Sequence, residues 1–188
     1  MRRRAAAARF ARGGSMAQGF LEGLAQRRRL ANVAGALLCF GMIGYALYTQ
    51  RFDALEPCPL CIFQRMAIFA LGVGFLIAAA LPSRRWAGVV GTLAVLLPAV
   101  TAGAIATRHL YIQSLPPGQV PACGATLDYM WDVFPVMEVL RKVLTGSGEC
   151  AKIDWTFLGL SMPGWVLVWA VLLAIWGVLA NWRRRARA

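Results

Sequence analysis

The sequence predicts an all-α membrane protein, a four-helix transmembrane bundle with one long polar loop. Hydrophobic residues make up 59% of the 188 residues and charged residues only 15%, whereas charged residues form about 25% of an average soluble domain. The apolar residues gather in four segments, each close to the roughly 20 residues that cross a bilayer as a helix. The chain therefore forms one membrane domain, with little left for a separate soluble one.

The net charge of +12 reflects membrane orientation rather than nucleic-acid binding. Arginines cluster in residues 1–29, at Arg84 and Arg85, and in residues 183–188. Clusters at every second membrane border follow the positive-inside rule. Most aromatic residues lie away from these arginines, whereas base stacking would require them close to the basic residues. We expect no nucleic-acid partner, and a multi-pass membrane protein in contact with membrane lipid, with both termini cytoplasmic.

The first half of the chain holds two predicted spans. Residues 1–29 form a basic cytoplasmic tail, rich in Ala, Arg and Gly, which we expect to be flexible. The first span covers residues 30–49, and a short periplasmic loop covers residues 50–59. The second span, residues 60–81, ends where Pro82 and two arginines stop the helix.

The second half holds the other two spans. Residues 86–107 form the third and contain Pro98, a predicted kink. The long periplasmic loop, residues 108–162, follows. The fourth span, residues 163–182, opens on a proline, which suits a first helical turn, and precedes the basic tail of residues 183–188.

The long loop contains a short amphipathic segment, residues 134–144. Its apolar residues recur with helical spacing, and Glu138, Arg141 and Lys142 fall on the other face. The segment predicts an interfacial helix lying in the membrane surface; a helix packed on loop residues is the alternative. Gly146 and Gly148 precede Cys150, and we expect them to give that cysteine mobility.

Four of the five cysteines fall in the two loops that share one side of the membrane. They are Cys58, Cys61, Cys123 and Cys150. Cys39 lies in the middle of the first span, where a small apolar residue suffices, and no role is assigned to it.

The Cys58-Pro59-Leu60-Cys61 motif could be a redox disulfide, half of a metal site or a structural staple. A structural zinc site needs four ligands, and Cys123 and Cys150 lie far apart in the loop, so no metal is expected. A staple over so short a loop contributes little. Pro59 suits the first turn of a helix, whose positive N-terminus favours thiolates. The redox interpretation is therefore preferred.

Arg65 lies on the same helical stripe as the two cysteines of this motif. A cation there favours a thiolate, and a charge inside a span is costly enough to suggest a function. Arg65 either snorkels to the nearby surface or faces the bundle and holds an anionic or carbonyl-bearing ligand. His109, at the outer end of the third span, could add a hydrogen bond to that ligand, or be merely interfacial.

Cys123 and Cys150 lie in an aqueous loop on an oxidising side, where disulfides persist. They could form a staple, or exchange electrons with Cys58 and Cys61. Four cysteines allow three pairings. A membrane-embedded pair needs a lipid-soluble electron acceptor, and a quinone is the obvious candidate.

Three blocks of the sequence resemble the disulfide bond formation protein B (DsbB) family. They are the Cys58-Pro-Leu-Cys-Ile-Phe-Gln-Arg65 motif, the His109–Gln113 stretch, and Gly146-Ser-Gly-Glu-Cys-Ala151 leading to Trp155-Thr-Phe-Leu-Gly-Leu160 and Met162-Pro-Gly-Trp165. The resemblance covers about residues 30–180. The basic tail before it looks longer than the family needs.

The resemblance implies a thiol:quinone oxidoreductase of the bacterial cell inner membrane, with the cysteine loops in the periplasm. A reduced periplasmic DsbA-like thiol oxidase would attack Cys123, and Cys150 would pass the electrons to the Cys58/Cys61 pair. Cys61 would lie against ubiquinone or menaquinone, with Arg65 stabilising the reduced forms, and the quinone would deliver the electrons to the respiratory chain. The relay from DsbA through DsbB to quinone is an established system.

Two other functions remain open at this point. A non-enzymatic scaffold with two structural disulfides would resist mild reductant and hold no quinone. A quinone reductase of the vitamin K epoxide reductase type would share the chemistry but not these loop motifs.

Overall fold

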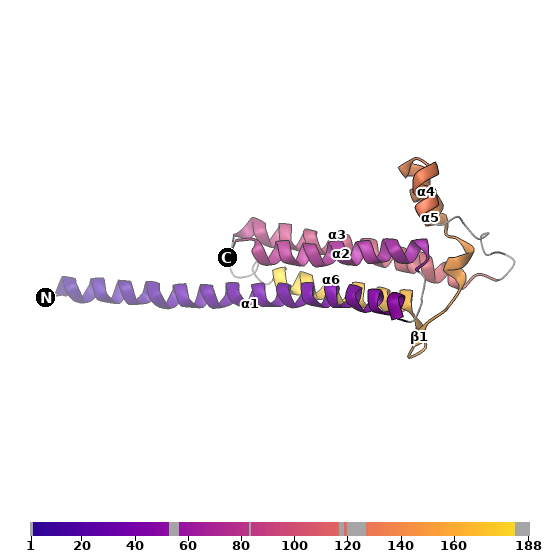
Figure 1. Cartoon of the computed structure of the whole chain (residues 1–188). Helices are drawn as coiled ribbons and strands as arrows, with labels where there is room; N and C mark the ends of the chain where they lie inside the picture. The colour runs from indigo at the N-terminus through magenta and orange to yellow at the C-terminus, as the bar shows by residue number, and fades with distance from the viewer. Residues whose placement is uncertain (1, 53–56, 83, 117–118, 120–126, 183–188) are drawn as a thin grey trace.

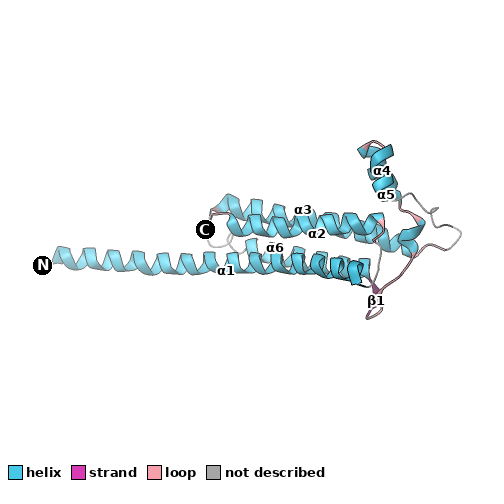
Figure 2. Ribbon diagram, in the orientation of Figure 1, coloured by secondary structure: helices cyan, strands magenta, loops and turns pink. Residues whose placement is uncertain are grey.

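The computed structural model describes residues 2–52, 57–82, 84–116, 119 and 127–182. Four helices in this part of the chain are long and apolar enough to cross a membrane: Gln26–Phe52, Pro59–Ala80, Trp86–Gln113 and Met162–Asn181. They lie side by side as an elongated bundle (Figures 1 and 2). The predicted all-α, four-helix membrane fold is confirmed.

The spanning helices are longer than their apolar cores. Helix α1 (Arg2–Phe52) begins near the N-terminus and extends far beyond the other helices (Figure 1). Residues 2–29, expected as a flexible tail, are thus helical, because alanine and arginine are strong helix formers. Helix α3 (Arg85–Gln113) likewise continues past residue 107 and includes His109. Pro98 lies within α3 without ending it.

Helix α2 (Pro59–Ala80) packs against α1 and α3, and α3 packs against α6 (Met162–Trp182). Contacts between α1 and α6 are far fewer. Glycines allow the close approaches: a Cβ on Gly74 would lie 2.1 Å from the carbonyl oxygen of Ala94. The Phe75 ring fills the centre, within 3.3 Å of the Cβ positions of both Gly35 in α1 and Gly177 in α6. Small residues thus let the helices pack at short range, as in other membrane bundles.

The end of the bundle opposite the cysteines contains a buried polar cluster. Asn32 Nδ2 donates to Asn181 Oδ1 at 3.3 Å, and Asn181 Nδ2 donates back to Asn32 Oδ1 at 3.1 Å. Arg28 donates to the carbonyl oxygen of Leu81 at the C-terminus of α2. A cation at that position complements the helix dipole. These bonds connect α1 with α2 and α6.

The long loop folds into short helices beside the bundle, α4 (Leu127–Val133) and α5 (Val136–Thr145) (Figure 1). The predicted amphipathic helix is present as α5, with Val139 and Val143 buried and Met137 exposed. It begins one residue after Pro135, which lies at the N-cap. The placement of α5 in the membrane surface stays a prediction.

A short 3-10 helix, η1 (Gly148–Ala151), and a two-stranded hairpin connect α5 to α6. Strands β1 (Thr156–Phe157) and β2 (Leu160–Ser161) pair antiparallel. The turn between them has positive φ at both residues, 50° at Leu158 and 79° at Gly159, as tight hairpins require. Trp165 Nε1 donates to the Phe157 carbonyl oxygen at 3.0 Å, which fixes the hairpin to the start of α6.

Candidate functional site

Cys58 and Cys61 lie at the N-terminus of α2, as the sequence predicted. Cys58 is the N-cap, Pro59 follows in the first turn, and the Cys58 sulfur accepts a hydrogen bond from the Cys61 backbone N–H at 3.4 Å. The two sulfurs are 3.3 Å apart and are free thiols. The helix N-terminus supplies backbone donors and a positive potential, both of which stabilise a thiolate.

His109 reaches the thiols from α3 and is almost completely buried, with 2% of its surface exposed. Its Nε2 atom lies 3.8 Å from Cys58 Sγ and 3.0 Å from the carbonyl oxygen of Cys150. Nδ1 is buried and makes no hydrogen bond with the described residues. His109 is thus buried within the protein beside the Cys58 thiol.

Cys150 is held in place in η1 and is 1% exposed. Its sulfur lies 3.6 Å from Ser147 Oγ. The hydrogen bond with Cys58, together with burial, raises the pKa of the Cys150 thiol. The thiol is therefore held in its protonated form next to Cys58.

The structure shows Cys150 in a packed position, and its expected mobility stays a prediction. Gly146 adopts φ +86°, and a Cβ there would lie 2.2 Å from Ile112 Cδ1. The glycine permits a close contact between the loop and α3, because only glycine adopts this conformation without strain in so little space. Gly146 therefore lets the segment before Cys150 pack closely against α3. Cys123 lies outside the described residues, so its predicted partnership with Cys150 stays a prediction.

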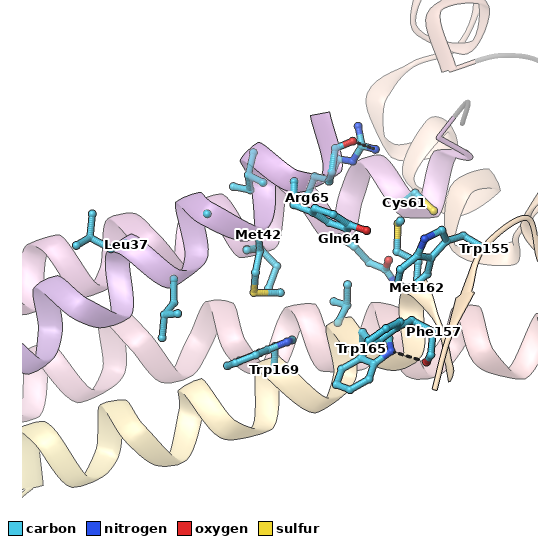
Figure 3. Close-up of a pocket in the computed structure, with 17 residues that line it drawn as sticks. Leu37, Met42, Cys61, Gln64, Arg65, Trp155, Phe157, Met162, Trp165 and Trp169 are labelled. Atoms are coloured by element: carbon cyan, nitrogen blue, oxygen red, sulfur yellow. Dashed lines mark hydrogen bonds between the residues drawn. The ribbon is translucent and has the colours of Figure 1, made fainter. Parts of the chain in front are cut away.

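A cavity of about 590 Å³ lies between α1, α2 and α6 below the hairpin (Figure 3). Its wall is mostly aliphatic and aromatic, including Met42, Trp165 and Trp169. Cys61 is the cysteine that lines the cavity. Gln64 and Arg65, from the next turn of α2, line it as well. The cavity has the size and apolar character of a small-molecule site with few polar groups.

Arg65 faces α1 at the cavity wall. One guanidinium nitrogen donates to the Ala46 carbonyl oxygen at 3.1 Å, and the other donates to Gln50 Oε1. Two residues of α1 thus fix the cation beside the cavity.

Gln64 also lines the cavity and is 3% exposed. Its Nε2 atom makes no hydrogen bond with any residue that the structure describes. A buried donor without a partner costs about 1–3 kcal/mol, which a ligand with an acceptor would offset. Gln64 is not among the predicted site residues, although a polar residue inside an apolar span is a signal that the sequence contains.

Three side chains of the thiol site could together hold a metal. The ligand atoms of Cys58, Cys61 and His109 all lie within 4.8 Å of one another. Cys39 is buried in α1 and takes no part in this cluster.

The fold and this site define a class: multi-pass membrane proteins with a dithiol at a helix N-terminus, between a folded loop and an apolar cavity. The family model described as disulfide bond formation protein DsbB matches residues 28–180. The chain belongs to this family. It is therefore a disulfide-generating membrane oxidoreductase, as the sequence predicted.

Curated relatives named disulfide bond formation protein B agree with this assignment. The one from Hahella chejuensis is 48% identical over 166 residues, covering 84% of this chain and 98% of the relative. Those from Xanthomonas axonopodis pv. citri and Xylella fastidiosa are 46% and 41% identical and cover 80% and 82% of this chain, and 88% and 90% of their own lengths.

Proposed function

We propose that this chain is a thiol:quinone oxidoreductase that reoxidises a periplasmic DsbA-like dithiol oxidase and passes the electrons to a membrane quinone. One observation supports this most strongly: the Cys58/Cys61 pair touches both sides of such a pathway. Cys58 lies against the loop cysteine Cys150, and Cys61 lines the apolar cavity. A dithiol that carries electrons from an aqueous donor to a lipid-soluble acceptor needs one sulfur near each of them, and Cys58 and Cys61 are placed in this way.

On the loop side, the partner dithiol attacks the disulfide that contains Cys123, and the electrons then reach Cys150. Exchange with Cys58 moves the electron pair inward: the reduced loop cysteines form their disulfide again as the Cys58–Cys61 disulfide is reduced to two thiols. His109 Nε2, beside Cys58 Sγ, is positioned to hold the proton that this sulfur gains or loses. The contact of His109 with the thiol is observed, and its predicted contact with a quinone stays a prediction.

On the cavity side, the polar groups match a quinone. When bound, a quinone accepts two electrons and two protons, and the reduced dithiol becomes a disulfide. Gln64 Nε2 is a buried donor without a partner among the described residues, suited to a carbonyl oxygen. Arg65 stabilises negative charge on the oxygens or on the Cys61 thiolate. Ubiquinone and menaquinone both offer such carbonyls.

The orientation we propose places both termini and the Arg84–Arg85 turn in the cytoplasm, and the loops with Cys58 and Cys150 in the periplasm of a bacterial inner membrane. The arginine clusters at the two termini and at Arg84–Arg85 would all lie on the cytoplasmic side, as the positive-inside rule requires. Residues 1–29 and 183–188 are then cytoplasmic. Membrane-impermeant thiol reagents applied to intact spheroplasts should label a cysteine placed at Leu158 and spare one placed at Pro82; the reverse pattern would overturn the orientation.

The experiment that tests the function follows quinone reduction spectroscopically with purified protein and a reduced thioredoxin-like dithiol. Quinone should be consumed one for one with dithiol oxidised. Single replacements of Cys58, Cys61, Cys123 and Cys150 by Ser should each abolish turnover, while Cys39→Ser keeps it. Retained turnover in any three of the four variants would overturn the proposal. A scaffold would instead resist mild reductant and reduce no quinone.

A further inference from the structure

The reduced thiol site has the composition of a soft-metal site. Two thiols from one helix turn and an imidazole from the neighbouring helix converge, with Cys58 Sγ 3.3 Å from Cys61 Sγ and 3.8 Å from His109 Nε2. Thiolates and imidazoles are the ligands that Zn²⁺ prefers. These three side chains can supply three of the four ligands of a tetrahedral zinc ion.

The spacing of the ligand atoms fits tetrahedral zinc with small adjustments. Zn–S bonds of about 2.3 Å and Zn–N bonds of about 2.0–2.1 Å place two sulfurs about 3.8 Å apart, and sulfur and nitrogen about 3.6 Å apart. The observed separations of 3.3 and 3.8 Å differ from these values by half an ångström or less.

The fourth position is open. Cys150 lies next to this cluster in η1, but its sulfur is not among the ligand atoms that lie within 4.8 Å of one another. The imidazole would exchange the hydrogen bond that Nε2 donates to the Cys150 carbonyl for coordination through Nε2, and its proton would move to Nδ1. Two cysteines and one histidine, with water in the fourth position, form a known zinc ligand set.

We propose that the reduced form of this protein binds one thiolate-preferring divalent cation, such as Zn²⁺, through Cys58, Cys61 and His109, and that the bound cation blocks disulfide formation. Each coordinating thiol releases its proton to solvent as its sulfur–metal bond forms, and no electrons are transferred. The oxidised pair cannot bind in this way because its sulfurs are joined to each other. Binding needs only the reduced thiols, whereas the inhibition rests on the proposed function.

The test titrates metal into the full chain in detergent, free of quinone and reduced with a phosphine that is then removed. Cd²⁺ reports directly through its thiolate charge-transfer absorption, and Zn²⁺ is measured by competition with a chromophoric chelator. We expect one equivalent of either metal to bind the reduced protein tightly and none to bind the oxidised protein. Equal binding by both forms would overturn the proposal.

Single variants locate the site. Cys58→Ser and Cys61→Ser should lose the charge-transfer band. His109→Gln should weaken Zn²⁺ binding at least tenfold, since losing even an outer partner of a metal ligand costs about 10–100-fold. The helical circular dichroism of each variant shows that it is folded.

Cys39→Ser and Cys123→Ser are the matched controls and should keep the full equivalent. If Cys123→Ser loses the metal and Cys58→Ser does not, the cation binds in the loop and the proposal is wrong. Because the readout is metal binding, it does not depend on the quinone assay. A protein that binds the metal but reduces no quinone would overturn the proposed function alone.

Discussion

Asn32 and Asn181, at one end of the bundle, exchange two hydrogen bonds, whereas Gln64 and His109, near the other end, each keep a buried nitrogen with no hydrogen bond to the described residues. The first end is closed by direct contact between α1, α2 and α6. The second contains the cavity and the thiols. In a membrane bundle, polar groups that pair with each other stabilise the helices. Polar groups left without partners mark the place where a ligand or a reaction is accommodated.

Removing a thiol should give the largest effect and tests whether the cavity end of the bundle serves the reaction rather than stability. Cys61→Ser should lower turnover at least about 10³-fold, because groups that act in one covalent sequence fail together. It should leave the thermal midpoint of the protein within a few degrees of the parent, because the thiol site is not the packed end. The measurements are quinone reduction and a thermal melt in detergent. A Cys61→Ser protein that turns over normally would contradict the role of the pair.

The next largest effect should come from the packed part of the bundle. Gly74→Ala places a Cβ 2.1 Å from the Ala94 carbonyl oxygen, and overpacking of this kind costs about 1–3 kcal/mol. The thermal midpoint should fall by about 2–4 °C per kcal/mol. Gly44→Ala is the matched control in α1, because nothing lies within 4 Å of its Cβ position. If both variants melt alike, the close approach of α2 and α3 is not what stabilises the bundle.

A smaller effect is expected at the cavity wall. Gln64→Leu removes a donor worth about 0.5–1.5 kcal/mol when paired, so the KM for quinone should rise about two- to tenfold. The kcat should change little, because a hydrogen bond made equally to the bound substrate and to the transition state affects only binding. Met66→Leu, on the exposed face of α2, is the control. An unchanged KM in Gln64→Leu would show that this amide does not contact the quinone.

The smallest effect should come from the asparagine pair. In a double-mutant cycle, Asn32→Leu and Asn181→Leu should show a coupling of about 0.6 kcal/mol and at most about 1.7 kcal/mol, the range found for hydrogen bonds within membrane bundles. Unfolding in mixed detergent measures it. Turnover should be unaffected, since the pair lies near the Arg28 contact with Leu81 at the C-terminal end of α2, whereas the thiols lie at its N-terminus. Additive single effects would show that the two amides do not stabilise each other.

The features that were predictable are those that depend on local chemistry. Helix-length apolar segments define the four spans, and a proline after Cys58 places the two thiols at a helix start. The burial of Cys150 was not predictable, because glycine permits either mobility or a tight contact, and Ile112 of α3 decides between them. The contact of His109 with Cys58 and the unpaired amide donor of Gln64 depend on which helices become neighbours. The spacing of residues within one segment does not determine how helices pack against each other.

The hairpin was also missed, because its strands are only two residues long and the turn places a leucine at positive φ. Such a turn usually takes glycine or asparagine at both central positions. Helix α1 is longer than predicted, because the basic, alanine-rich segment before the first span is helical. The hairpin departs from what residue composition suggests, whereas this segment follows its alanine and arginine content.

The wall of the cavity on α1 has a consequence for how turnover must be measured. Leu37, Leu38 and Tyr45 line the cavity and are also among the exposed apolar residues of a spanning helix, so the opening faces hydrocarbon. A substrate that enters this way is supplied by two-dimensional diffusion, and its effective concentration is its mole fraction in the lipid. Adding quinone-free lipid at fixed bulk quinone should therefore slow the reaction by surface dilution, while diluting the buffer should not.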